Sequence, residues 1–212
     1  MKGNLVNVEL NSIEEIELPD RFFGCDVNKY ILYLAVKRHF ANMRRGTADT
    51  QERGDVDYST KKVRSQKGTG RSRQGARTSN IWKGGAVAFG SHPRDFSLKM
   101  NKKERKNSIF SALSSRVKDG DVYVIEGINA SGKTKEFKEI LGKVEELIKK
   151  SLGTILIIFS EENGDVERAS RNLPYCGALN FRYLNAYVLT LFDSIIISKE
   201  AIECLGRWWP ND

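Results

Sequence analysis

The sequence predicts an α/β fold: a three-layer αβα domain with a mainly parallel central sheet, interrupted by a long extended basic loop. Two observations carry this prediction. After residue 101, short apolar runs alternate with helical patterns, an order that implies right-handed crossovers between parallel strands. Between residues 46 and 94 the hydrophobic periodicity stops, as in a functional or disordered insertion. We therefore expect one domain made of residues 1–45 and 95–212, with a loop inserted at 46–94.

The first globular part contains one predicted strand and one predicted helix. Leucine and valine alternate with polar residues over 4–10, the pattern of a half-buried strand. From residue 28 to 45 the apolar positions fall at helical spacing, which predicts an amphipathic helix; they are Leu32, Val36, Phe40 and Met43.

The second globular part begins with a helix and then alternates. Asn101 and Glu104 form a capping-box pattern ahead of Ile109, Leu113 and Val117, which lie one helical turn apart. Regular alternation follows. Strands are predicted at 121–126, 154–160, 179–184 and 193–198, and helices at 133–150, 164–172 and from Lys199 onward.

Residue counts exclude several classes of protein. Three widely spaced cysteines without a Cys-x-x-Cys motif argue against a disulfide framework or a zinc site. Two histidines, His39 and His92, are too few for a histidine metal centre. The N-terminus is unlike a targeting peptide, and no run approaches the roughly 18 apolar residues of a membrane span. We expect a soluble intracellular protein without a metal, a cofactor or a membrane partner.

The charge is concentrated in one part of the chain. The net charge is +8, but residues 44–106 hold 17 basic and 6 acidic residues, a net of +11, so the rest carries −3. Between Tyr58 and Arg94 there are nine basic residues and no acidic one. A segment this basic and this poor in apolar residues points to a polyanionic partner, nucleic acid before membrane.

The residue types of the basic loop suit nucleic acid. Its glycines allow the backbone to come close to the surface of a partner, and each of its arginines can bind a phosphate through two or more parallel N–H donors. Trp82 can stack on a base or pack on a sugar. These features describe an arm that folds onto structured RNA or DNA; the alternative is a solvated linker. His92 lies inside this segment and is a candidate for phosphate contact, and His39 is expected to face the core or the nucleic acid.

A block from residue 66 to 117 carries a family resemblance. Its most specific part is Gln66-Lys67-Gly68-Thr69-Gly70-Arg71, and the motifs that follow are Trp82-Lys83-Gly84-Gly85, Phe89-Gly90, Pro93-Arg94 and Asn101-Lys102-Lys103. In these motifs the sequence closely resembles the bacterial-type family of large-subunit ribosomal protein L four. The block covers about a quarter of the chain, and the order of strands and helices fits the family over nearly its whole length.

The resemblance implies a structural protein of the large ribosomal subunit that acts early in assembly and catalyses no reaction. Its loop would thread through ribosomal RNA, with its tip at the wall of the peptide exit tunnel beside ribosomal protein L twenty-two; no homo-oligomer is expected. By residue matching, the tip would comprise Gln66, Lys67, Gly68 and Thr69, and the stem would comprise Arg71, Arg73, Arg77, Trp82, Lys83 and Arg94. We also expect RNA contacts from Arg44, Arg45, Lys61, Lys62, Arg64, Gly70, Gln74, Gly84, Gly85, His92, Lys99, Lys102 and Lys103.

A second motif offers a different class of function. The stretch from Gly127 to Thr134 has the phosphate-loop spacing, in which Lys133 would reach the terminal phosphates of a nucleotide and Thr134 would hold magnesium. The alternative to the ribosomal protein is therefore a phosphate-loop NTPase with a basic RNA-binding insertion. Against it, the strand at 154–160 ends in Ser160-Glu161-Glu162 rather than in the Asp that magnesium needs. We then expect Ser131 to cap the following helix. A free RNA chaperone or regulator is a third possibility.

Overall fold

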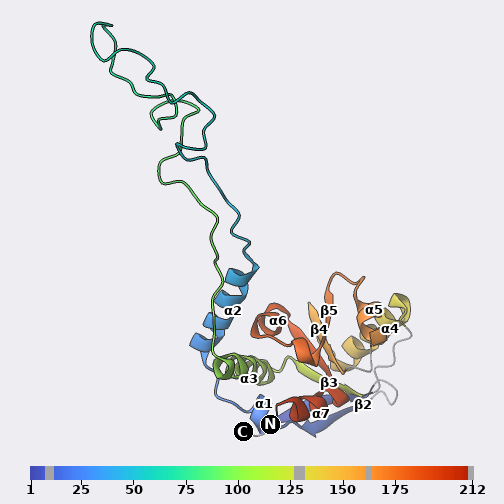
Figure 1. Cartoon of the computed structure of the whole chain (residues 1–212). Helices are drawn as coiled ribbons and strands as arrows, with labels where there is room; N and C mark the ends of the chain where they lie inside the picture. The colour runs from blue at the N-terminus through green and yellow to red at the C-terminus, as the bar shows by residue number, and fades with distance from the viewer. Residues whose placement is uncertain (8–11, 127–131, 161–163, 210–212) are drawn as a thin grey trace. The chain divides into compact units, whose positions relative to one another are not determined.

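The computed structural model describes residues 1–7, 12–126, 132–160 and 164–209 (Figure 1). The chain divides into two compact units. One comprises Met1–His39 with Lys99–Asp212, and we call it the α/β domain; the other is Phe40–Leu98, and we call it the arm.

The α/β domain contains a six-stranded sheet in the order β2-β1-β3-β6-β4-β5. Only the β1–β2 pair is antiparallel, and the other four pairs are parallel, so the prediction of a mainly parallel sheet is confirmed. The edge strand β2 was not predicted, because its sequence SIEEIE is dominated by glutamate. The strands are β1 (Lys2–Asn7), β2 (Ser12–Glu17), β3 (Val122–Glu126), β4 (Ile155–Phe159), β5 (Cys176–Asn180) and β6 (Ser194–Ser198).

Helices connect the parallel strands, as the alternating pattern predicts. Two of them, α1 and α6, are too short to show a helical period in the sequence. Among the described residues the helices are α1 (Asp20–Phe23), α2 (Lys29–Met43), α3 (Lys102–Asp119), α4 (Thr134–Ile148), α5 (Gly164–Ser170), α6 (Ala186–Leu191) and α7 (Lys199–Trp208). A short 3-10 helix, η1, covers Phe181–Tyr183.

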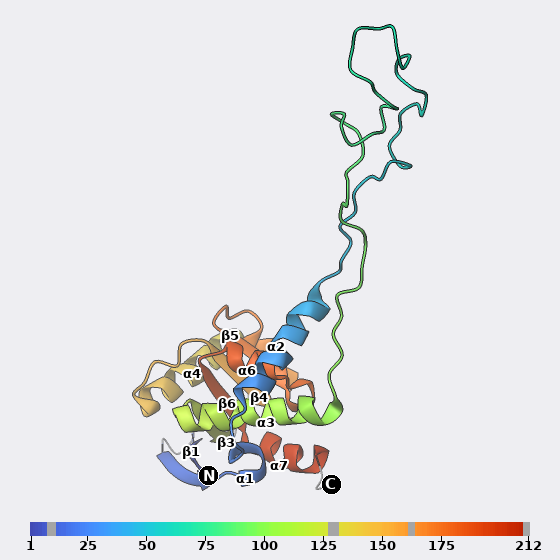
Figure 2. The same cartoon turned by 90° about the vertical axis from the view of Figure 1, so that its left-hand side faces the viewer.

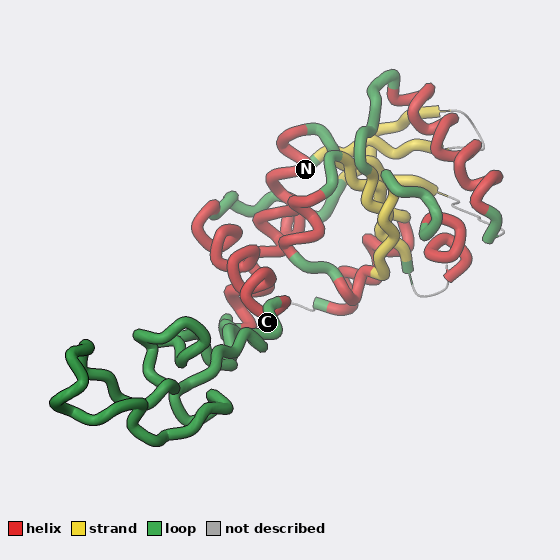
Figure 3. Tube along the Cα trace, turned by 90° about the horizontal axis from the view of Figure 1, so that it is seen from above, coloured by secondary structure: helices red, strands yellow, loops and turns green. Residues whose placement is uncertain are grey.

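The central strands bury both faces, which gives the domain its three layers (Figures 2 and 3). On β3, Val124 packs with residues of α1, α3, α6 and α7, whereas its neighbour Ile125 packs with residues of α4 and α5. This division follows from strand geometry, because successive side chains point to opposite faces. Two apolar cores therefore sandwich the sheet, as the sequence predicts.

Some boundaries differ from the prediction. The strand expected at 179–184 is β5, which ends at Asn180, because the Asn180 side chain accepts a hydrogen bond from the Arg182 backbone (3.0 Å) and starts η1. Of the strand expected at 4–10, residues 8–10 lie outside the described residues. The amphipathic helix at 28–45 is α2, but it buries no residue fully, and Phe40 and Met43 are exposed. His39 is half-buried and stacks on Tyr187 with ring centroids 4.2 Å apart.

The described ranges contain no helix long and apolar enough to cross a membrane. They also contain no group of three or more His, Cys, Asp or Glu side chains arranged to hold a metal ion.

Candidate nucleic-acid interface

The two ends of the arm are tied together at its root. Residues 44–98 form neither helix nor strand. The Arg94 amide donates to the carbonyl of Gly46 (3.1 Å), and the Leu98 amide donates to Oδ1 of Asn42 (2.9 Å). Gly46 has a φ of 65°, and a Cβ there would lie 2.0 Å from the Arg94 carbonyl oxygen. Only glycine fits this closure.

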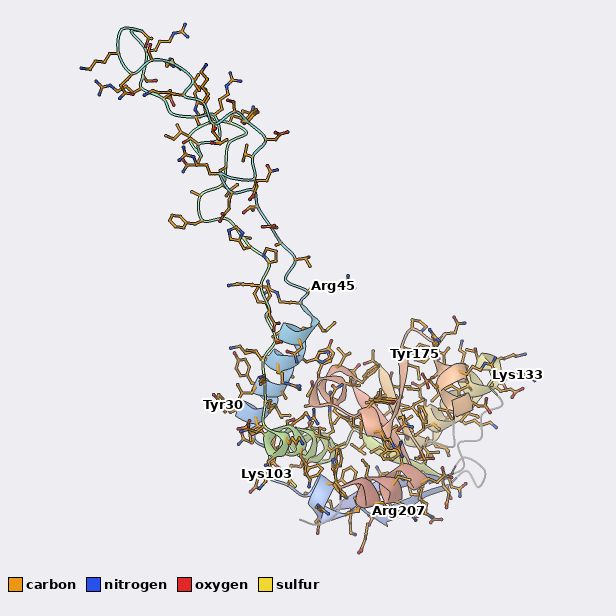
Figure 4. The ribbon with its side chains drawn as sticks, in the orientation of Figure 1. Tyr30, Arg45, Lys103, Lys133, Tyr175 and Arg207 are labelled. Atoms are coloured by element: carbon orange, nitrogen blue, oxygen red, sulfur yellow. The ribbon has the colours of Figure 1, made fainter. Side chains whose placement is uncertain are left out.

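Cations at the root pack against an aromatic ring. The guanidinium carbons of Arg44 and Arg94 lie 4.0 Å and 4.3 Å from the ring centroid of Phe96. Phe96 is half-buried, while both arginines are exposed. The ring therefore restrains two guanidinium groups. A guanidinium group that is already restrained loses less conformational entropy when it binds phosphate. Arg45, labelled in Figure 4, is also exposed at this root.

His92 lies between two carboxylates of the arm. Its Nδ1 is 3.3 Å from Oδ1 of Asp49, and its Nε2 is 3.0 Å from Oε1 of Glu52. Both ring nitrogens therefore face acids of the same unit. This arrangement links the two segments of the arm, because Asp49 and Glu52 come from its first part and His92 from its last.

The middle of the arm is built around Trp82. The Trp82 amide donates to the Ser79 carbonyl (3.1 Å), and the Gly85 amide donates to the Trp82 carbonyl (2.9 Å). A Cβ on Gly85 would lie 2.0 Å from the Ser79 oxygen, and Gly84 has a φ of 81°. Trp82 is half-buried, and its Nε1 is buried without a hydrogen-bond partner among the described residues. The glycines expected to touch RNA therefore also shape this turn.

The predicted tip is open. Gln66, Lys67, Gly68 and Thr69 are all exposed, and the Val63 amide donates to the carbonyl of Gly75 (3.2 Å) behind them. The tip's backbone turns at glycines with positive φ, 85° at Gly68 and 62° at Gly70, and a Cβ on either would meet open space. Gln66 also accepts a hydrogen bond from Lys62 Nζ.

The arm's basic side chains face outward. Of the nine between Tyr58 and Arg94, all are exposed except Arg64, which is half-buried. Within the described part of the chain, none of the nine forms an ion pair with a carboxylate. Those nine are Lys61, Lys62, Arg64, Lys67, Arg71, Arg73, Arg77, Lys83 and Arg94. Gln74 is half-buried and donates to the Ser72 hydroxyl (3.2 Å).

Three of the predicted RNA-binding residues belong to the α/β domain. Lys99 precedes α3, and Lys102 and Lys103 are the first two residues of that helix. All three are exposed, and Figure 4 labels Lys103. The capping box predicted at this helix end is present, with the Asn101 amide donating to Oε2 of Glu104 (3.4 Å).

The phosphate-loop motif lies only partly within the described residues. Gly127, residues 128–131 with Ser131, and the pair Glu161-Glu162 are outside them. The helix after the motif begins at Thr134, and Lys133 at its N-cap pairs with Oε1 of Glu136 (3.0 Å). The nucleotide interpretation needs an acid at the end of a strand next to β3. Its described neighbours, β1 and β6, end in Asn7 and Ser198.

Four cations were missed by reasoning from the sequence. Arg38, Arg105, Lys106 and Arg182 line a groove of the α/β domain together with Lys102 and Lys103. Arg105 and Lys106 continue the basic run at 102–103, and that adjacency was the available signal. Arg38 and Arg182 come from α2 and η1, and only the fold brings them to α3.

Comparisons with known proteins agree with the resemblance. The family model described as "Ribosomal protein L4/L1 family" matches residues 16–208. The chain is 35% identical over 203 residues to the large ribosomal subunit protein uL4 of Lachnospira eligens, covering 95% of this chain and 96% of that protein. It is 38% identical over 202 residues to that of Carboxydothermus hydrogenoformans (95% and 96%), and 39% identical over 197 residues to that of Desulforudis audaxviator (92% and 93%). The chain therefore belongs to the ribosomal protein L4/L1 family, a family of structural proteins of the ribosome rather than of enzymes.

Proposed function

We propose that this chain is a structural constituent of the large ribosomal subunit that binds large-subunit ribosomal RNA through its arm and aids early assembly of the subunit. Family membership supports the ribosomal role, and with it a cytoplasmic place in bacteria. The observation that carries the RNA proposal is the run of nine arm cations between Tyr58 and Arg94. No acid interrupts the run, and none of the nine forms an ion pair with a carboxylate of the residues that the structure describes.

Phosphate is the ligand that this arm suits. Arginine forks bind phosphate oxygens in pairs, and each phosphate neutralised releases counterions from the RNA. Arg71, Arg73 and Arg77 are exposed and separated by small or polar residues, so each can reach a separate phosphate. The two exposed guanidinium groups on Phe96 extend this surface to the root of the arm.

A salt titration tests RNA binding by the arm. We compare the wild type with a loop variant (Arg71→Gln, Arg73→Gln and Arg77→Gln), using large-subunit ribosomal RNA. Losing three phosphate contacts is expected to weaken binding. Log affinity falls as log salt rises, and the magnitude of this slope should decrease by about 2 to 3, at about 0.7 to 0.9 per contact.

The matched control removes the same charge from the α/β domain. The control variant carries Lys138→Gln, Lys143→Gln and Arg171→Gln, three exposed positions on α4 and just after α5. Its slope should stay near that of the wild type. If the loop variant and the control variant gave the same slope, RNA binding by the arm would be refuted.

We also propose that Gln66, Lys67, Gly68 and Thr69 help to form the exit-tunnel wall near ribosomal protein L twenty-two. The resemblance of Gln66-Lys67-Gly68-Thr69-Gly70-Arg71 and the open turn at the two positive-φ glycines support this placement. A photo-crosslinking residue at Lys67 in assembled large subunits should crosslink to tunnel RNA, to L twenty-two or to a stalled nascent chain. The same residue at Lys138 is the control, and equal crosslinking patterns would contradict the placement.

A further inference from the structure

We propose that the outer edge of strand β2 binds an extended segment of another protein, rich in lysine and arginine, which adds to the sheet as a further strand. Strand β2 comes first in the order of the sheet, and β1 is its one neighbour among the described strands. The edge belongs to the α/β domain. That the partner is a protein of the large subunit rests on the proposed function, but binding of a basic strand can be tested without RNA.

The register of the β1–β2 pair shows which backbone groups of β2 face outward. Met1 and Leu18 exchange two hydrogen bonds, from the Leu18 amide to the Met1 carbonyl (2.7 Å) and from the Met1 amino group to the Leu18 carbonyl (3.3 Å). In an antiparallel pair, such residues alternate with residues whose N–H and C=O point away from the partner strand. Counting back from Leu18, the outward residues are Glu17, Glu15 and Ile13. The outer edge therefore offers three amides and three carbonyls to an added strand.

The outward residues are open to solvent. Ile13 is 46% exposed, and Glu15 and Glu17 are exposed as well. Ile13 lies opposite Val6, which is fully buried in the apolar cluster beneath α4 and α5. An apolar side chain on an added strand could cover Ile13 and extend that cluster. An accessible edge with unpaired backbone groups is a template for pairing with another chain.

The charge of β2 selects the kind of partner. Glu14, Glu15 and Glu17 are all exposed, and the strand contains no basic residue. Lys2 Nζ pairs with Oε2 of Glu15 (2.6 Å), whereas Glu14 and Glu17 form no ion pair with a residue that the structure describes. Opposite charges on neighbouring strands stabilise a sheet, and like charges destabilise it. Lysine and arginine on the added strand would therefore be stabilising.

The same charges argue against two other occupants. RNA phosphate would be repelled by the three glutamates. A second copy of this chain that paired β2 with β2 would bring glutamates of the two copies together, which is destabilising. Charged side chains on an edge strand can also serve only to prevent association. In that case no basic strand would bind, so a binding measurement separates the two roles.

The first test measures binding of a short basic strand to the free protein. The probe is a capped, fluorescent peptide that alternates lysine and valine, and the comparison peptide alternates threonine and valine. We expect the lysine peptide to bind the wild type more tightly, as measured by fluorescence anisotropy. An edge variant with Glu15→Gln and Glu17→Gln should bind it at least about twofold more weakly, because two cross-strand charge pairs are lost.

The matched control removes two acids from elsewhere in the same domain. The acid control variant carries Asp119→Asn and Glu167→Gln, exposed positions on α3 and α5. It should bind the lysine peptide as the wild type does. The proposal would be overturned if the edge variant and the acid control variant bound equally, or if the lysine peptide bound no better than the threonine peptide.

Proline substitutions at neighbouring positions test the added strand itself. Glu15→Pro removes an outward N–H, so its midpoint of urea unfolding should stay near that of the wild type. Its affinity for the lysine peptide should fall at least about twofold below that of Glu15→Gln, because one backbone hydrogen bond is lost. Glu14→Pro removes an N–H that faces β1 and should lower the midpoint. Equal destabilisation by both prolines, or peptide binding by Glu15→Pro equal to that of Glu15→Gln, would refute strand addition.

Crosslinking in assembled large subunits identifies the partner. A photo-crosslinking residue at Glu17 should crosslink to a segment of another protein that is rich in lysine and arginine, and the same residue at Glu167 should not capture that segment. Crosslinks at Glu17 to RNA alone or to a second copy, or no crosslink, would overturn the proposal. The edge variant should keep the wild-type salt slope on ribosomal RNA, whereas the loop variant should keep the wild-type affinity for the lysine peptide. Failure of the edge proposal and failure of RNA binding by the arm are therefore distinguishable.

Discussion

At the residue scale, Asp193 shows how one side chain can join two neighbouring strands. Its Oδ2 accepts hydrogen bonds from the Thr154 amide (2.9 Å) and hydroxyl (2.7 Å), and its own amide donates to the Thr154 carbonyl (3.0 Å). Thr154 precedes β4 and Asp193 precedes β6, so these bonds set the register at which two paired strands begin.

These bonds predict a pH dependence of stability. The hydrogen bonds from Thr154 lower the pKa of Asp193 below its ordinary value of 3.8. A carboxyl with a lowered folded-state pKa stabilises the fold above that ordinary value, and the stabilisation is lost as pH falls through the lowered pKa. Asp193→Asn should therefore be less stable than the wild type at pH 7, and the difference should shrink as pH falls below 3.8.

Urea unfolding between pH 7 and pH 3 measures this difference. The companion variant Thr154→Val removes the hydroxyl donor but keeps the amide, so its pH dependence should lie between those of the wild type and Asp193→Asn. A stability difference that is constant over the whole pH range would show that the ionised carboxylate is not what matters.

At the element scale, the C-terminal part of α3 stabilises the end of the short helix α6. Its last turns carry Arg116, whose guanidinium donates to the carbonyls of Leu189 (3.1 Å), Thr190 (3.1 Å) and Phe192. Those carbonyls lie at the C-terminal end of α6, where four carbonyls lack partners within the helix. One side chain therefore caps a six-residue helix that has little stability of its own.

How far an element could be predicted depended on whether its signal was local. The α3 helix was predicted because its capping box and apolar spacing lie within one stretch. The end of β5 was misplaced because Asn180 redirects the chain by a side-chain hydrogen bond, and the apolar residues beyond it belong to η1. In β2, the pairing with β1 overrides a sequence that holds three glutamates.

The same distinction applies to the two candidate surfaces. The arm could be predicted from composition, because its cations and glycines are contiguous in the sequence. The groove of the α/β domain could not, because Arg38 and Arg182 lie far from Lys102 in the chain and meet it only through tertiary packing. The Arg44–Phe96–Arg94 stack was missed for a similar reason, since it joins the two ends of the arm.

At the scale of the whole molecule, the apolar core and the basic segment are separate. Both hydrophobic clusters consist of residues of the α/β domain alone. Within the arm, the buried residues described are Val56, Ala76 and Thr78. Burial of apolar surface is the main favourable contribution to folding, so the arm contributes little to the stability of the domain. The residues outside 44–106 carry a net charge of −3, so the electrostatic attraction for RNA comes mainly from residues 44–106.

This separation predicts that the domain folds without the arm. Because the Arg94 amide reaches the Gly46 carbonyl at 3.1 Å, a Gly/Ser linker of about four to six residues can replace 46–94. The shortened protein should keep the helical signal of the wild type in far-UV circular dichroism and a similar midpoint of urea unfolding. Its RNA affinity and its salt slope should both fall, because the nine cations between Tyr58 and Arg94 are removed. Loss of cooperative unfolding would show that the arm belongs to the folding unit, and an unchanged salt slope would contradict RNA binding by the arm.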